Sequence, residues 1–94
     1  SWVDLSIETI QYLSRQALVT PFRSKKSKRF FLNTSPTHAN GEPMDVYKSM
    51  DINGRTFYLY AKWSASDHIR NCINMAKSLQ VDISTIRVKL REQA

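Results

Sequence analysis

The amino-acid sequence predicts an α+β fold, in which an N-terminal helix, an antiparallel β-sheet, a long second helix and a short C-terminal helix follow in order. Apolar residues recur at spacings of three and four in two separate segments, which is the period of an amphipathic helix. Between these segments lies the dipeptide Asn53-Gly54, flanked by two stretches typical of β-strands. With 94 residues, the chain is expected to form a single domain, 1–94.

The first helix is predicted over residues 4–18. Asp4 and Ser6 are candidate caps at its start, and Pro21 would prevent it from continuing. Its apolar face would consist of positions three or four residues apart, namely Leu5 or Ile7, Ile10, Leu13 or Ser14, and Ala17.

Three short segments follow this helix. Residues 23–29 are basic and are predicted as a loop or the start of a strand. Residues 29–34 are predicted as a short strand because they include two phenylalanines and a leucine. Residues 35–43 contain two prolines and an Asn-Gly pair and are predicted as a loop.

Residues 46–63 are predicted to form a β-hairpin. Asn53 and Gly54 suit a two-residue turn in which both residues take positive φ. In the second arm, one face would carry Phe57, Leu59 and Ala61, and the other Tyr58, Tyr60 and Lys62. Tyr58, Tyr60 and Trp63 would stack on unpaired bases if they faced solvent, but packing is the preferred explanation for these aromatic residues.

The second long helix is predicted over residues 64–80. Ser64 and Asp67 resemble a capping box, with Asp in place of the usual Glu. The expected apolar stripe consists of Ile69, Cys72 or Ile73, Ala76 and Leu79.

The last segment allows two interpretations. As a helix over 83–91, it would be capped by Asp82 and would direct Ile83, Ile86 and Leu90 to one side. As a closing strand, it would alternate Ile86, Val88 and Leu90 with basic and polar residues, whereas the helix would leave Val88 in water. Periodicity alone fits the strand slightly better. The helix is favoured because Ala76, Leu79 and Val81 would pack beneath it and Asp82 would cap it, and the closing strand is kept as the alternative.

In its helical form this segment resembles the helix-turn-helix of many repressors and of small modules in homing nucleases, over about 20 residues. The matching positions are Ala76, Leu79, Gln80, Val81, Asp82, Ser84, Thr85, Ile86 and Leu90. The pattern usually has Gly where this chain has Gln80, because the turn requires positive φ. The resemblance implies a recognition helix that enters a DNA groove, with Ser84, Thr85, Arg87 and Arg91 facing the nucleic acid.

The positive charge of the chain is concentrated in one segment. The net charge is +6, and no acidic residue occurs from Thr9 to Gly41. A dense basic patch favours an anionic partner such as nucleic acid. Five basic residues lie within seven positions, namely Arg23, Lys25, Lys26, Lys28 and Arg29.

Signatures of enzymes, metal sites and membrane spans are absent from the sequence. It contains no phosphate-binding loop, no zinc-ligand pair of cysteines and no apolar run of about 18 residues. His68 and Cys72 would share a helix face, but a structural zinc site needs about four ligands. A single cysteine does not indicate an oxidising compartment, so we expect a cytoplasmic protein without cofactor or metal.

These observations predict a small, non-enzymatic nucleic-acid-binding protein with a regulatory or accessory role in transcription. Duplex DNA is the expected partner, although the sequence does not distinguish DNA from RNA. The alternative is a small protein-binding module, such as an inhibitor or adaptor, whose basic patch docks on an acidic protein surface. No membrane partner is expected, and the oligomeric state is left open.

Overall fold

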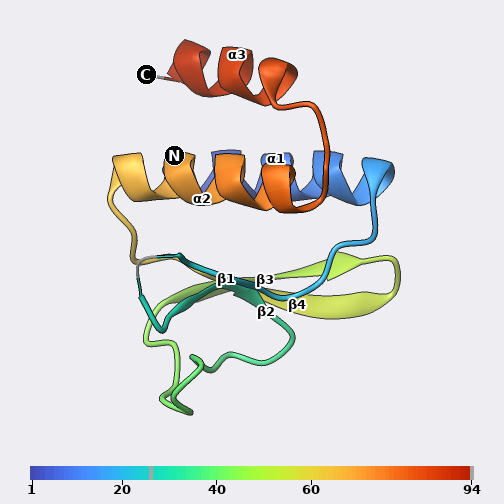
Figure 1. Cartoon of the computed structure of the whole chain (residues 1–94). Helices are drawn as coiled ribbons and strands as arrows, with labels where there is room; N and C mark the ends of the chain where they lie inside the picture. Colours follow the sequence, from blue (N-terminus) through green and yellow to red (C-terminus); the bar gives the residue numbers. More distant parts are fainter. Residues whose placement is uncertain (26, 94) are drawn as a thin grey trace. The chain divides into compact units, whose positions relative to one another are not determined.

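The computed structural model describes residues 1–25 and 27–93, with side chains for all of these except residues 85, 89, 92 and 93. It is an α+β structure with three helices and a four-stranded antiparallel sheet among the described residues (Figure 1). The chain divides into two compact units. A helical unit contains residues 1–19 and 64–94, and a sheet unit contains residues 20–63.

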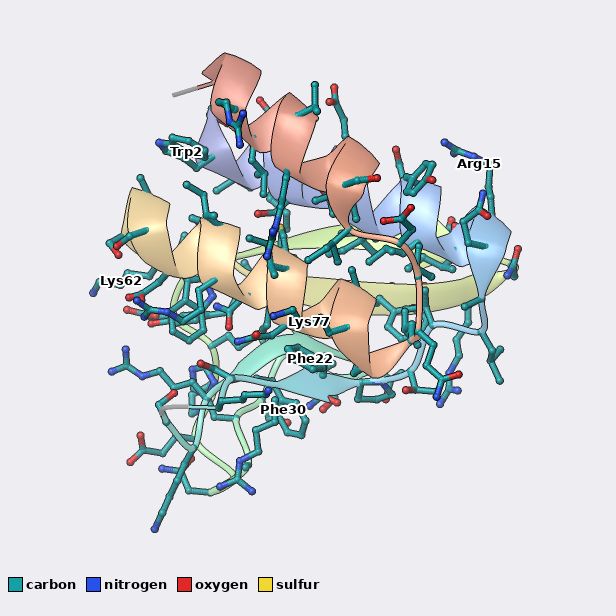
Figure 2. All side chains as sticks on the ribbon, turned by 45° about the horizontal axis from the view of Figure 1, so that its top comes forward. Trp2, Arg15, Phe22, Phe30, Lys62 and Lys77 are labelled. Carbon is teal, nitrogen blue, oxygen red and sulfur yellow. The ribbon has the colours of Figure 1, made fainter. Side chains whose placement is uncertain are left out.

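The helical unit consists of α1 (Trp2–Gln16), α2 (Ala65–Ser78) and α3 (Ser84–Gln93). Helices α1 and α2 pack against each other, and the chain then turns back into α3 (Figure 1). Trp2 and Arg15 mark the two ends of α1, and Lys77 lies in the last turn of α2 (Figure 2).

Helix α1 begins two residues earlier than the sequence predicts. Its N-cap is Ser1, whose hydroxyl accepts a hydrogen bond from the Asp4 amide at 3.2 Å, so neither Asp4 nor Ser6 is the cap. The buried face contains apolar and hydroxyl side chains together, namely Leu5, Ser6, Thr9, Ile10 and Leu13. The Thr9 hydroxyl donates to the Leu5 carbonyl at 2.9 Å, which allows Thr9 to be buried without loss of its hydrogen bond.

Helix α2 is capped as predicted, and its buried face agrees with the predicted apolar stripe only in part. The Ser64 hydroxyl accepts a hydrogen bond from the Asp67 amide at 3.2 Å. The buried residues are His68, Asn71, Cys72, Met75 and Ala76. Cys72 and Ala76 of the expected stripe are thus buried, whereas Ile69, Ile73 and Leu79 are only half-buried. The polar side chains of His68 and Asn71 lie in the core instead.

The turn after α2 is a Schellman motif. The Val81 amide donates to the Ala76 carbonyl at 3.0 Å, and the Gln80 amide donates to the Lys77 carbonyl at 3.0 Å. Gln80 has a φ of 57°, the left-handed conformation that the resemblance requires at this position. Asp82 then accepts a hydrogen bond from the Ser84 amide at 3.0 Å and satisfies one amide of the first turn of α3.

The last segment is a helix, which confirms the favoured interpretation over the closing strand. Ile86 and Leu90 are buried, while Val88 is 53% exposed. The alternation of Ile86, Val88 and Leu90 is thus not used to form a sheet. The helix buries Ile86 and Leu90, which lie four positions apart, and leaves the apolar side chain of Val88 in water.

The sheet unit contains β1 (Phe22–Arg23), β2 (Phe30–Asn33), β3 (Tyr47–Ile52) and β4 (Arg55–Tyr60). The strands are arranged in the order β1-β2-β4-β3, and each neighbouring pair is antiparallel. Between β1 and β2, Phe22 pairs with Leu32 and Arg23 pairs with Phe30; Figure 2 labels both phenylalanines.

The β3–β4 hairpin turns at Asn53-Gly54, as predicted. Asn53 has a φ of 53° and Gly54 a φ of 83°, so both residues take the left-handed conformation. Phe57 and Leu59 are buried on one face. On the other face Tyr60 is only 2% exposed, which excludes Tyr60 as a stacking platform for bases.

The loop between β2 and β3 folds back on itself. An isolated bridge pairs Thr37 with Pro43, and the His38 amide donates to the Glu42 carbonyl at 2.8 Å. Gly41, with a φ of 86°, turns the chain between them. This small hairpin holds His38 and Glu42 next to each other on an otherwise irregular segment.

Candidate functional site

The basic segment is the turn that joins β1 to β2. The Ser24 amide donates to the Arg29 carbonyl at 3.0 Å, and the Arg29 amide donates to the Ser27 hydroxyl at 3.1 Å. The Lys28 carbonyl accepts a hydrogen bond from the Ala39 amide at 3.1 Å, which ties the turn to the neighbouring loop. Residues 23–29 are called the basic turn below, and these hydrogen bonds anchor its backbone at Ser24, Lys28 and Arg29.

The basic side chains of this turn are exposed and have no carboxylate partner among the described residues. Arg23, Lys25, Lys28 and Arg29 all face solvent, and none of them takes part in an ion pair within the described part of the chain. Lys26, which the sequence assigns to the same patch, lies outside the described residues. Within the described part of the chain, no ion pair therefore neutralises a cation of the basic turn.

Helix α3 carries the second set of predicted residues. Ser84, Arg87 and Arg91 are exposed, as the helix-turn-helix resemblance expects, while the side chain of Thr85 lies outside the described part. Next to Arg87 and Arg91 runs an open groove of about 400 Å³. Its other lining residues are apolar, namely Ile69, Ile73 and Leu90.

The two predicted surfaces belong to different units. The basic turn lies in the sheet unit and α3 lies in the helical unit. Each surface is complete within its own unit, so either can be altered without changing the residues of the other.

A polar pocket in the sheet unit went unrecognised in the sequence. It has a volume of about 310 Å³, and one of its walls is Arg29 of the basic turn. The lining residues come from the basic turn, the loop before β3, the end of β4 and the segment just after β4. They are Arg29, His38, Glu42, Pro43, Asp45, Tyr60 and Lys62.

The buried ring of Tyr60 organises this pocket. The His38 ring meets it edge-on with centroids 4.6 Å apart, and the Arg29 guanidinium carbon lies 5.7 Å from its centroid. Such a cation–aromatic contact holds the guanidinium close to the ring. Trp63 contacts Tyr60 with centroids 5.4 Å apart. At the side of the pocket, the Lys62 ammonium donates to the Asp45 carboxylate at 3.1 Å.

The ionisable groups of the pocket influence one another. The hydrogen bond from Lys62 lowers the pKa of Asp45, so this carboxylate stays charged and paired. Burial, followed by the nearby Arg29 cation, lowers the pKa of His38, while Asp45 and Glu42 act in the opposite direction. Burial raises the pKa of Tyr60, which keeps its phenol neutral. The Nδ1 atom of His38 is buried and has no hydrogen-bond partner among the described residues.

The only sequence signal for this pocket is the loop around Asn40-Gly41, since a tight turn there brings His38 close to Glu42. Arg29, Tyr60 and Lys62 join them only through the pairing of the strands.

A second polar cluster lies inside the helical unit. The Ser6 hydroxyl and the His68 Nδ1 atom are 2.8 Å apart, and the Cys72 thiol donates to Ser6 at 3.7 Å. Burial raises the pKa of Cys72 to about 11, so the thiol is protonated at neutral pH and is a poor nucleophile. Within the described residues, no group of three or more His, Cys, Asp and Glu side chains is arranged to hold a metal ion.

Comparison of the chain with protein-family models, with curated proteins and with solved structures found no match. None of the helices in the described residues is both long enough and apolar enough to cross a membrane.

Proposed function

We propose that this protein binds nucleic acid, most naturally duplex DNA, and that the basic turn supplies its contacts to backbone phosphates. The observation that carries the proposal is the exposed group of unpaired cations formed by Arg23, Lys25, Lys28 and Arg29. Each phosphate contact releases counterions and adds a salt-dependent contribution to affinity. The anchored backbone of the turn supports this role, because less conformational freedom is lost when the turn binds.

In this proposal, α3 contributes sequence preference rather than bulk affinity. Arg87 and Arg91 are exposed one helical turn apart, so they lie on the same side of α3. Arginine donates two parallel hydrogen bonds to the major-groove edge of guanine. The protein would then act in the cytoplasm as a small regulator or accessory factor, with the basic turn and α3 engaging DNA from separate units.

The test is a pair of charge-reversal variants with equal charge change. Lys25→Glu/Lys28→Glu should weaken binding to a generic DNA duplex at low salt. The slope of log affinity against log salt should fall by about two, near 0.9 for each lost contact. Lys48→Glu/Lys77→Glu is the control, since both lysines are exposed but lie outside the two proposed surfaces.

Fluorescence anisotropy of a labelled duplex measures both quantities. Equal loss of affinity in the two variants would mean that only net charge matters, and would remove the basic turn from the proposal. If the unaltered protein does not bind duplex at low salt, nucleic acid is the wrong partner. Docking on an acidic protein surface then becomes the proposed role of the basic turn.

A further inference from the structure

The polar pocket described above has an imbalance between hydrogen-bond donors and acceptors. The Asp45 carboxylate is already engaged by Lys62 at 3.1 Å. Arg29 has no carboxylate partner within the described part of the chain, and the buried Nδ1 atom of His38 has no hydrogen-bond partner there. Buried ring nitrogens are nearly always paired in proteins, so an unpaired one beside a pocket calls for an explanation such as a bound ligand.

The size and lining of the pocket restrict what it can hold. Its volume of about 310 Å³ lies at the lower end of the range for small-molecule sites. Most such sites are lined by apolar side chains, whereas this one is lined mainly by charged and polar groups. A small, strongly hydrophilic group therefore fits better than a hydrophobic ligand.

We propose that this pocket binds a phosphate group through Arg29 and His38, and that a proton is taken up by His38 when the group binds. The arginine guanidinium matches the geometry of phosphate oxygens and can donate two parallel hydrogen bonds to them. The ring of Tyr60 sets the position of both ligating side chains, because each of them contacts it.

The charges that line the pocket explain why His38 takes up a proton when phosphate binds. The pocket faces two cations, Arg29 and Lys62, and two carboxylates, Glu42 and Asp45, so its formal charge is zero while His38 is neutral and Tyr60 is un-ionised. Burial and, after it, the nearby Arg29 cation lower the pKa of His38. A bound phosphate places negative charge beside both groups, which offsets the effect of Arg29 and favours the protonated imidazole. Protonation of His38 then gives the pocket a charge of +1, which suits an anion.

This inference stands apart from the proposed function, although Arg29 belongs to both. The phosphate could be part of a nucleic acid that lies on the basic turn, or it could belong to a free small molecule. Lys25→Glu/Lys28→Glu leaves every lining residue of the pocket in place. That variant should therefore lose affinity for duplex DNA and keep the response of the pocket to inorganic phosphate.

The experiment is an NMR titration of the imidazole signals with inorganic phosphate and, separately, with sulfate at matched ionic strength. Sulfate keeps its charge across the pH range, so the pH dependence of its affinity reports protonation of the protein, and comparison with His38→Gln isolates the contribution of His38. The protein has only two histidines, and His68 in the helical unit is the internal reference. We expect saturable shifts at His38, little change at His68, and sulfate affinity about tenfold higher at pH 5.5 than at pH 8, as a one-unit rise in pKa would give.

The chain offers a matched control for Arg29. Arg55 is also exposed and lies over an aromatic ring of the same unit, 5.8 Å from the centroid of Phe57, but it does not line the pocket. Arg29→Ala should abolish the His38 response, while Arg55→Ala should preserve it. His38→Gln should bind sulfate with little dependence on pH.

A hexanucleotide with and without a 5′-phosphate then identifies the source of the group. A response only to the phosphorylated strand indicates a terminal phosphate, and equal responses indicate the backbone. Response to inorganic phosphate alone indicates a small molecule. The proposal is overturned if no anion shifts the His38 signals in a saturable way, or if Arg29→Ala and Arg55→Ala reduce the response equally.

Discussion

Ser6 on α1 and His68 on α2 share a hydrogen bond of 2.8 Å between their Oγ and Nδ1 atoms, although 62 positions separate them in the sequence. Ser6 is 1% exposed and His68 is 2% exposed, so the bond lies in the interior of the helical unit. It joins two helices that pack against each other and places polar groups at a contact where apolar side chains were expected. The first prediction concerns this contact.

Ser6→Ala should lower the free energy of unfolding by about 1–3 kcal/mol, because it removes a buried hydrogen-bond partner of His68 and Cys72. Urea denaturation followed by circular dichroism measures the change. Ser49→Ala, at an exposed position of β3, is the control and should change stability by less than about 0.5 kcal/mol. Equal effects of the two substitutions would show that the Ser6–His68 bond does not stabilise the protein.

Gln80→Gly should stabilise the protein by about 1 kcal/mol. Gln80 has a φ of 57° at the Schellman turn, and a residue with a Cβ atom is disfavoured in that conformation. Gln11→Gly, in the interior of α1, should have the opposite sign and destabilise by about 1 kcal/mol. Thermal denaturation of both variants tests the pair, and a destabilised Gln80→Gly variant would contradict the turn geometry.

Arg87→Ala/Arg91→Ala should reduce the preference of the protein between DNA sequences more than its overall affinity, if α3 reads base edges. Competition between a selected duplex and a shuffled duplex measures this preference. The basic turn is unaltered in this variant, so weak binding to generic duplex should persist. A uniform loss of affinity for all sequences would instead assign Arg87 and Arg91 to phosphate contacts.

The stability of the protein should fall at alkaline pH in a way that depends on Cys72. Burial raises the pKa of this thiol from 9.0 to about 11. Because the folded pKa exceeds the unfolded one, the stabilising contribution is complete below pH 9 and is lost as the pH rises toward 11. Between pH 8 and pH 10.5 the unaltered protein should lose about 2 kcal/mol more than the Cys72→Ala variant. Parallel losses in the two proteins would contradict this assignment.

Local signals in the sequence were sufficient for several elements. Asn53-Gly54 determines the hairpin turn because few other residues tolerate positive φ at both positions. Ser64 begins α2 because its hydroxyl accepts a hydrogen bond from a free amide of the first turn. Periodicity alone fits a strand slightly better for the last segment, and the helix is favoured by the Asp82 cap and the apolar residues before it. The segment is a helix, and Asp82 accepts a hydrogen bond from the Ser84 amide.

Features that depend on contacts between distant residues were not predicted. The sequence ranks Ile69 and Ile73 as core residues by hydrophobicity, but His68 is buried instead and Ser6 of another helix meets it there. The polar pocket likewise depends on the approach of Arg29 and His38 to Tyr60, which the pairing of β2 with β4 makes possible. Hydropathy and periodicity report which face of one element is apolar, not which polar groups find partners across two elements.

The helical unit is built from two chain segments, 1–19 and 64–94, that are synthesised at different times. The sheet unit is one continuous stretch, residues 20–63, and it interrupts the helical unit between α1 and α2. Proteins are synthesised from the N-terminus, so all four strands leave the ribosome before α2 does. Helix α1 precedes the sheet unit in the chain, so it is made well before α2, the helix against which it packs. During translation the apolar side chains of α1, among them Leu5, Ile10 and Leu13, therefore lack their α2 partner while residues 20–63 are added.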